Sequence, residues 1–194
     1  MKSFSIKSFL FAPLLFCCSF VVWSHGYVKS PESRSYYCKL GVNKQCGPVQ
    51  YEPQSIEGKQ GFPKYGPADG KIASAANALF SPLDIQTTVR WQRAIINSPN
   101  VRFKWRITAK HKTTKWEYFI TKPDWQPNSP LSRKQFILTP FCKFERVEIP
   151  GESVEHNCVL PKNQKGYHVI LAIWTINDTV NAFYQVIDAE KRKS

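Results

Sequence analysis

The chain has 194 residues, 42% of them hydrophobic, and its 27 basic and 14 acidic side chains give a formal net charge of +13. This length is enough for one domain with its own core, and neither a linker rich in Ser, Gly or Pro nor an internal repeat divides it. The basic residues are scattered along the sequence, so their pattern favours a solvated surface over a site for nucleic acid or an anionic envelope.

The first 24 residues have the layout of a secretory signal peptide. Two lysines precede an apolar run over residues 9–22, which is too short and wrongly flanked for a membrane-spanning helix. Val22 and Ser24 stand three and one positions before a cleavage point after Ser24, where signal peptidase accepts small or modest side chains. The sequence therefore predicts a secreted, extracellular protein whose single mature domain covers residues 25–194, with a net charge of +11.

Cleavage at that point would make His25 the first residue of the mature chain. A free N-terminal histidine offers its α-amine and its own Nδ1 to one metal ion and closes a chelate ring, whereas an amide nitrogen in the same place would be a poor ligand. The alternative is that some residue has to come first and histidine does so by chance, and position alone does not decide between the two.

Four cysteines remain after removal of the signal, and an even number in an exported domain predicts two disulfides. Four cysteines allow three pairings. The most economical is the local one, which joins Cys38 to Cys46 and Cys142 to Cys158.

The first third of the mature chain carries few signals of regular structure. Residues 26–50 read as irregular, and residues 51–90 are richer still in Gly and Pro, with one short helix expected around Ile72–Leu79. A loop region this long within a compact domain is usually functional or disordered. Its aromatic residues and a neighbouring disulfide favour an ordered, functional insertion.

From residue 85 the hydrophobic period changes to two. Apolar residues at 101, 103, 105 and 107 alternate with polar ones and predict a half-buried strand. Further strands are expected over 116–120, 135–139, 168–174 and 182–188, and the continuous apolar run in 168–174 is typical of a strand covered on both sides. The sequence thus predicts an all-β fold, an antiparallel sandwich of the immunoglobulin or fibronectin III type, with the long loop and short-helix insertion at one end.

The four histidines of the chain divide into two groups. His111 lies just past the end of the strand at 101–107, on the same side as Ala109, where its side chain can reach toward a first residue held nearby. With the two nitrogens of His25, a ring nitrogen of His111 would complete a T-shaped set of three donors, which suits Cu(II) better than zinc. For His156, which neighbours a cysteine, and His168, which opens the buried strand, structural roles are favoured.

Several short motifs occur in order along the mature chain. They are His25-Gly-Tyr, Cys-Gly-Pro-Val-Gln-Tyr-Glu-Pro-Gln-Ser-Ile-Glu-Gly over 46–58, Gly-Pro-Ala-Asp-Gly over 66–70, Thr-Ala-Lys-His over 108–111, Tyr-Phe-Ile-Thr-Lys-Pro over 118–123, Thr-Pro-Phe-Cys over 139–142, and Trp174 with Asn-Ala-Phe-Tyr over 181–184. On these motifs the chain resembles the small secreted bacterial lytic polysaccharide monooxygenases of auxiliary activity family 10, most closely the chitin-active ones first described as chitin-binding proteins.

This resemblance implies one copper ion per chain, held by the amine and Nδ1 of His25 and by a ring nitrogen of His111. Phe183 matches the aromatic residue on one axial side of the metal, Ala109 the small residue on the other, and Glu57 the acidic residue near the oxygen-binding position. Each also has a plain structural reading, as a core ring, a strand spacer and a solvated carboxylate.

A flat polar face that meets the polysaccharide is also implied by the resemblance, with the matching residues Tyr51, Glu52, Pro53, Gln54, Ser55, Asp178, Thr179 and Asn181. The expected activity is copper-dependent cleavage of β-1,4 bonds in crystalline chitin by C1 hydroxylation, which leaves aldonic acid ends and uses an external electron donor with O2 or hydrogen peroxide. The protein is expected to act as a monomer without nucleic-acid or membrane partners. The alternative is a non-catalytic chitin-binding or adhesion protein with the same face, and a basic envelope or nucleic-acid binder is a third class.

Overall fold

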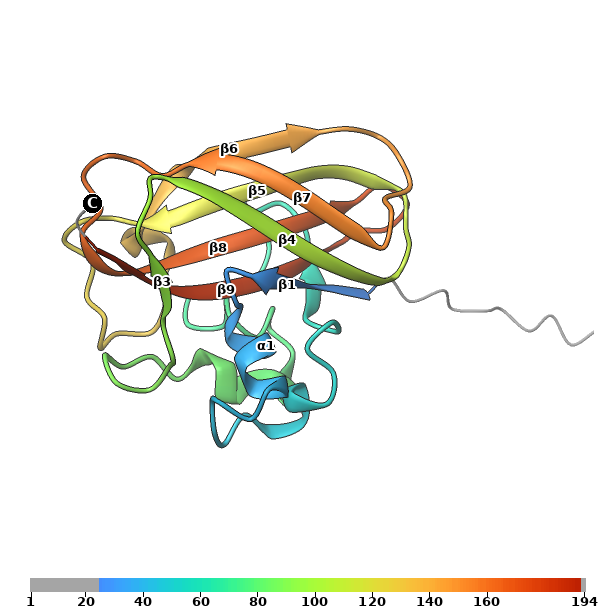
Figure 1. The fold of residues 1–194 in the computed structure, drawn as a ribbon. Coiled ribbons are helices and arrows are strands. Elements are labelled where there is room, and N and C mark those ends of the chain that lie inside the picture. Colours follow the sequence, from blue (N-terminus) through green and yellow to red (C-terminus); the bar gives the residue numbers. More distant parts are fainter. Residues whose placement is uncertain (1–24, 193–194) are drawn as a thin grey trace, which may run out of the picture.

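The computed structural model describes residues 25–192, which form a β-sandwich of two sheets (Figure 1). The smaller sheet has the strand order β1-β4-β7, with bounds His25–Ser30, Asn100–Ala109 and Ser153–Val159. The larger sheet has the order β2-β9-β8-β5-β6, with bounds Glu57–Lys59, Asn181–Lys191, Gly166–Ile176, Thr113–Thr121 and Phe136–Glu145. A short strand β3, Ala94–Ile96, adds to β9 in parallel, and the other pairings are antiparallel. The predicted all-β sandwich is confirmed.

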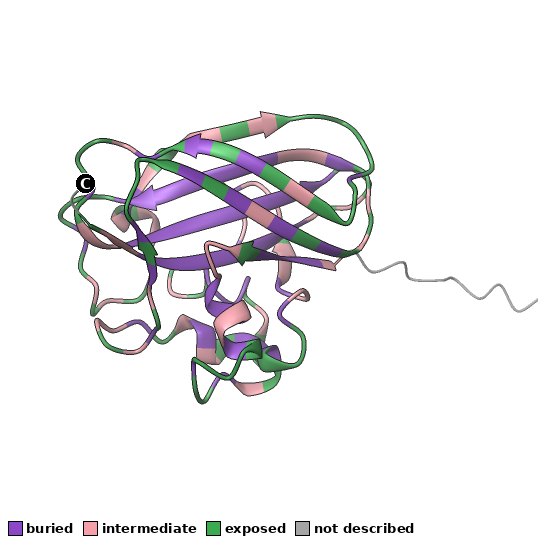
Figure 2. Ribbon diagram, in the orientation of Figure 1, coloured by how far each residue is buried: buried purple, intermediate pink, exposed green. Residues whose placement is uncertain are grey.

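Strand burial follows the sequence pattern. Along β4 the apolar residues from Val101 to Ile107 are buried and the intervening residues are exposed or half-buried, as alternation predicts (Figure 2). Nearly all of β8 and β9 is buried, because the larger sheet is covered on both faces. The apolar run at 168–174 therefore belongs to a strand that is covered on both sides, as predicted.

The molecule has two apolar cores, one on each face of the larger sheet. The first lies between the sheets and gathers Phe103, Trp105 and Trp174 with their neighbours. The second lies between the outer face of the larger sheet and the loop region, where Ile72 and Phe80 pack with residues such as Leu171. The insertion thus covers a face of the sheet, and its expected place at one end of the sandwich was wrong.

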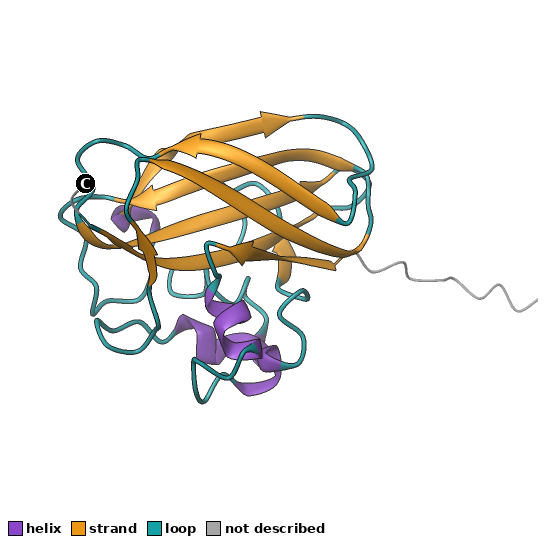
Figure 3. Ribbon diagram, in the orientation of Figure 1, coloured by secondary structure: helices purple, strands orange, loops and turns teal. Residues whose placement is uncertain are grey.

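Most helical residues gather in the loop region beside the sandwich, whereas the short helix directly before β6 lies apart from them, next to the strands (Figure 3). Helix α1 spans Arg34–Lys39, and the 3-10 helices η1, η2 and η3 span Gly47–Gln50, Ala78–Asp84 and Arg133–Gln135. The interpretation of residues 26–50 as irregular missed β1 and α1. The signal for α1 was Ser33, whose hydroxyl accepts a hydrogen bond from the Tyr36 amide and caps the helix. No described helix is both long and apolar enough to cross a bilayer.

The helix expected at Ile72–Leu79 is also displaced. Turns occupy residues 72–76, and the 3-10 helix η2 begins only at Ala78. Ala75 and Ala76 have φ angles of 56° and 62°, in the left-handed region that an α-helix cannot contain. Composition favoured a helix here, and the tertiary packing of the turn overrode it.

Both local disulfides form as predicted. Cys38–Cys46 joins the end of α1 to the residue before η1, and Cys142–Cys158 joins β6 to β7. Since β6 and β7 are edge strands of different sheets, the second disulfide links the two layers of the sandwich.

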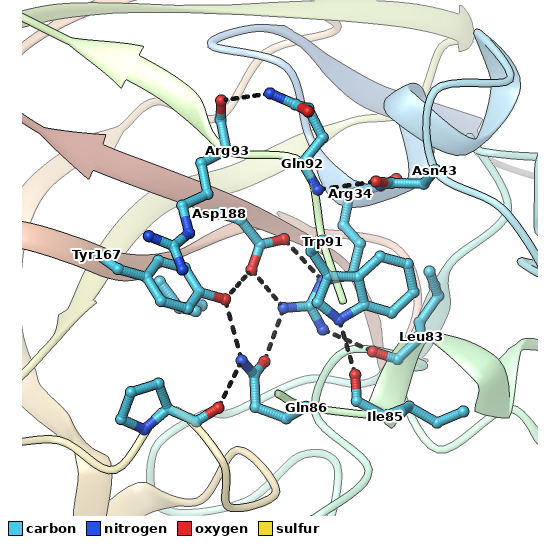
Figure 4. A network of polar contacts seen from close by, with 12 residues as sticks. Arg34, Asn43, Leu83, Ile85, Gln86, Trp91, Gln92, Arg93, Tyr167 and Asp188 are labelled. Carbon is cyan, nitrogen blue, oxygen red and sulfur yellow. Dashed lines mark hydrogen bonds and ion pairs between the residues drawn. The ribbon is translucent and has the colours of Figure 1, made fainter. Parts of the chain in front are cut away.

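A buried ion pair connects α1 to the last strand (Figure 4). The Arg34 guanidinium donates to both carboxylate oxygens of Asp188, at 2.9 and 2.7 Å, and the two side chains are 1% and 0% exposed. Arg34 also donates to the Leu83 carbonyl and to Gln86, while Tyr167 donates to Asp188 at 2.6 Å. Both charges are therefore fully surrounded by partners, as burial requires.

Removing one partner would leave the other charge buried without compensation. We expect Arg34→Met to lower the free energy of unfolding by about 3–5 kcal/mol. The matched control is Lys104→Met, because the Lys104–Glu155 pair is 43% and 41% exposed and should contribute only about 0.2–1 kcal/mol. Denaturant unfolding of both variants checks this, and equal losses would contradict the assigned importance of burial.

His156 and His168 are buried, in agreement with the structural roles predicted for them. Burial lowers the pKa of His156 to about 4 and also lowers the pKa of His168. The Tyr118 hydroxyl lies at hydrogen-bond distance, 2.7 Å, from Nδ1 of His156 and accepts a hydrogen bond from the Trp105 indole.

A histidine whose pKa is lowered by folding takes up its proton more readily in the unfolded chain. The free energy of unfolding should therefore fall as the pH drops from about 6.5 to about 4, by at most about 3 kcal/mol from this residue, and level off below. In His156→Gln the free energy of unfolding should fall less steeply with pH over this range, because the contribution of His156 is lost. The carboxylates titrate equally in both proteins and do not affect the comparison. Chemical denaturation at pH 7, 5.5 and 4 measures the difference, and parallel curves would refute it.

Candidate functional site

The predicted site residues meet at one end of the sandwich, where β1 begins, β4 ends and β8 turns into β9. His25 is paired with Ala109, the last residue of β4. The turn that follows β4 carries His111, and its Lys112 carbonyl accepts a hydrogen bond from the Asn177 amide at 2.7 Å. In Figure 1 this is the end at which β1 starts.

Backbone contacts hold the start of β1 closely against the sandwich. The Thr108 hydroxyl donates to the His25 carbonyl at 3.3 Å, and the Gly26 amide donates to the Gln54 carbonyl at 3.1 Å. A Cβ at Gly26 would lie 2.9 Å from Ile107 Cδ1 and 3.1 Å from the Trp174 ring. Glycine thus allows the backbone beside His25 to approach the core.

The two nitrogens of the His111 ring have different surroundings. Nδ1 lies 3.2 Å from a carboxylate oxygen of Asp178, so this nitrogen carries the proton and donates it to the carboxylate. Nε2 is buried and has no hydrogen-bond partner among the described residues. A buried polar atom without a partner costs free energy, and a bound metal would remove that cost.

The nitrogen atoms that could bind a metal at this end of the sandwich suit copper. Within residues 25–192, no three or more His, Cys, Asp or Glu side chains come together in a way that could hold a metal ion. The two histidines at this end of the sandwich offer ring nitrogens, and a free α-amine at His25 would add a further nitrogen donor. An all-nitrogen set of this kind suits copper.

Phe183 and Glu57 lie side by side next to the histidines. They face each other across the β2–β9 ladder, so their side chains share one face of the sheet. Phe183 is fully buried, and its ring centroid lies 6.5 Å from that of His25. Glu57 is half-buried and accepts a 2.8 Å hydrogen bond from the Asn181 amide group.

The residues predicted for the flat polar face differ in exposure. Tyr51 is 76% exposed, and Glu52 and Asp178 are also exposed, whereas Gln54, Ser55, Thr179 and Asn181 are half-buried. Pro53 is buried, and its carbonyl accepts a hydrogen bond from Gln185, so it anchors the loop. A cavity of about 620 Å³ opens between β6 and β7, and its lining includes none of the predicted site residues.

Sequence reasoning missed two features of this end of the molecule. It assigned Asp178 to the polar face and not to His111, from which it is separated by 67 residues. It also missed the stack behind Phe183, where the Trp174 and Trp116 rings lie 5.0 Å apart at 6° and the Trp174 indole donates to the Thr113 hydroxyl. No local pattern signals either contact, since both depend on strand register.

The chain matches the family described as lytic polysaccharide mono-oxygenase, cellulose-degrading, over residues 25–189. Among curated proteins it is similar to the GlcNAc-binding proteins A of Shewanella oneidensis, with 54% identity over 85% of this chain and 35% of the relative, and of Vibrio cholerae, with 46% identity over 88% and 37%. This chain thus spans little more than a third of the length of these relatives.

Solved structures show the same architecture. An AA10 lytic polysaccharide monooxygenase from Photorhabdus luminescens has 50% identity and a TM-score of 0.86, over 88% of this chain and all of the other. A CBM33 protein from Bacillus amyloliquefaciens, solved in complex with Cu(I), has 39% identity and a TM-score of 0.78, over 87% of this chain and all of the other. The family match and the sandwich agree: this chain belongs to the lytic polysaccharide monooxygenases of auxiliary activity family 10, a family of copper-dependent polysaccharide monooxygenases.

Proposed function

We propose that the mature chain is a secreted copper monooxygenase that cleaves β-1,4 bonds in crystalline chitin by oxidation at C1, leaving aldonic acid ends. The observation that carries this proposal is the buried, unpartnered Nε2 of His111 next to the strand that begins with His25. Chitin is favoured over cellulose because similar curated proteins are named for GlcNAc binding, although the family description itself names cellulose.

Each residue at the proposed copper site has a task that its position supports. His25, through its α-amine and Nδ1, and His111, through Nε2, would hold one copper ion. Asp178 keeps His111 in the tautomer in which Nε2 carries the lone pair, so that this nitrogen would be available to hold the metal. When bound, copper would supply the one-electron chemistry by which an external donor and O2 or hydrogen peroxide oxidise the sugar.

The other residues next to the proposed copper site control access to it and the transfer of protons. The Phe183 ring has no donor atom, so it closes one side of the site without ligating, while Ala109 leaves room on the other side. Glu57 accepts a hydrogen bond from Asn181 at the edge of the site. Its carboxyl group can hold an oxygen species by a hydrogen bond or transfer a proton to it.

The surroundings suit a planar polymer. Tyr51 presents an exposed ring that can stack on the C–H face of a sugar, and the short polar groups beside it can hydrogen-bond to hydroxyl and acetamido groups. Export is proposed from the signal over residues 1–24, which lies outside the described residues, and from the two disulfides.

The main alternative is a non-catalytic chitin-binding or adhesion protein. The names of the relatives favour binding as such, and both functions would use the same flat face. They differ only in whether copper at the two histidines produces oxidised ends.

The first test is His111→Ala, compared with the wild type on β-chitin with copper and ascorbate. We expect mass spectrometry to find aldonic acid products with the wild type and none with the variant, because one of three copper donors is lost. Metal-free binding to β-chitin should stay close to the wild-type value. Intact mass must first show that both proteins begin at His25, and oxidised products from the variant would refute the copper assignment.

The second test concerns Asp178. Because its carboxylate fixes the orientation and tautomer of His111, Asp178→Ala should weaken Cu(II) binding by about 10- to 100-fold in calorimetry of the metal-free protein. Glu52→Ala removes an equal charge from the same face without a contact to His111 and should leave the copper affinity nearly unchanged. Equal effects of the two variants would point to overall charge and not to the hydrogen bond.

A further inference from the structure

We propose that the loop over residues 60–66 carries a second stacking position for the polysaccharide, formed by the ring of Tyr65 with Lys64 beside it. This inference rests on the proposed function and extends the contact surface beyond the face around Tyr51. It assigns a ligand-binding role to an aromatic residue that the sequence motifs did not single out.

The loop starts at the rim of the proposed site. Lys59, at the end of β2, pairs with Asn181. The next residue, Gln60, donates from its amide to the Val180 carbonyl and from its side chain to the Thr179 carbonyl, both at 3.0 Å. The loop is thus tied directly to the turn between β8 and β9, which carries part of the predicted polar face.

Hydrogen bonds hold the loop in one conformation. The Arg133 guanidinium donates to the Pro63 carbonyl at 2.6 Å, to the Tyr65 carbonyl at 2.7 Å and to the Asp69 carboxylate at 2.7 Å. The Tyr65 amide donates to the Gly61 carbonyl at 2.8 Å. An anchored backbone does not have to be ordered on binding, which reduces the entropy lost when a ligand is bound.

The Tyr65 ring is nevertheless largely in solvent. It is 63% exposed, comparable to Tyr51, and it packs beside Gly61, where a Cβ would come within 3.2 Å of the ring. Gly61 has a φ of 104°, so its backbone conformation and the close approach of the ring both call for glycine. The loop is therefore built to present this aromatic ring, since the core does not bury it.

The pair Lys64–Tyr65 fits a neutral sugar. An exposed tyrosine ring stacks on the C–H face of a pyranose, and its hydroxyl can exchange hydrogen bonds with sugar hydroxyls. The exposed Lys64 ammonium lies 5.2 Å from the ring centroid, a weak contact at an open site, and it can turn to donate to hydroxyl or acetamido oxygens.

The two exposed tyrosines are anchored to different parts of the rim. The loop of Tyr51 is tied to β1 through the Gln54 carbonyl, whereas the loop of Tyr65 is tied to the β8–β9 turn through Gln60. Two separately anchored rings suit an extended polymer, which can contact both at once.

The experiment is a set of binding isotherms of the metal-free protein on β-chitin. We expect Tyr65→Ala to weaken binding by about threefold to tenfold and Tyr65→Phe by less than about twofold, because the phenyl ring still stacks. The factors lost by Tyr51→Ala and Tyr65→Ala should multiply in the double variant. The matched control is Leu79→Ala, which truncates a side chain that is 67% exposed in η2 and should bind like the wild type. Unchanged melting temperatures will show that the loop variants fold.

The outcomes separate this inference from the proposed function. If the wild type binds chitin and Tyr65→Ala binds equally well, the second stacking position is refuted and the copper chemistry stands. Equal losses in Tyr65→Ala and Tyr65→Phe would refute stacking, since they would assign the effect to the hydroxyl. A wild type that neither binds nor oxidises β-chitin would overturn the proposed function and the proposed ligand of Tyr65 with it.

Discussion

The antiparallel pairing of β1 with β4 is the contact on which the proposed site depends. It sets His25 opposite Ala109, two residues before His111, and so brings together two histidines that are 86 residues apart in sequence. The pairing can come this close to the core because position 26 has no side chain. Every further element of the site is arranged around this junction, from Phe183 behind His25 to Asp178 beside His111.

The rest of the fold holds that junction in place. The larger sheet is packed on both faces, so β8 and β9 have little freedom to move. The turn between these strands carries Asp178, which contacts His111. The loop region forms one of the two cores and is tied to β9 through the buried Arg34–Asp188 pair. Such rigidity suits a binding site, since a soft rim would lose entropy whenever it bound a ligand.

Much of this arrangement could be predicted from the sequence, and what could not has a physical explanation. The alternation in β4 and the apolar run of β8 are local patterns, and they placed those strands correctly. Both disulfides were predicted by pairing each cysteine with its neighbour in the sequence, which is correct because each bond closes a short loop. The turns around Ala75 and Ala76 escaped prediction, since tertiary packing there outweighs helix propensity.

The candidate site divides in the same way. Predicted cleavage and motif resemblance singled out His25 and His111, which the strand pairing does bring to the same end of the sandwich. The partner of His111 could not be foreseen, because it follows from how a turn is anchored to distant residues. The aromatic residues of residues 51–90, Tyr65 among them, did favour an ordered insertion. The buried position of Pro53 likewise depends on its contact with Gln185 on β9.

The place of β9 in the chain has a consequence for how the protein is assembled. This strand is the last one described, yet it is paired with β2, β3 and β8 and supplies Phe183. Contacts between such distant segments form slowly, because the intervening chain has to be ordered first. A growing polypeptide lacking β9 would therefore have neither of its two cores closed, and the proposed copper site, which includes Phe183, would take shape only at the final stage of folding.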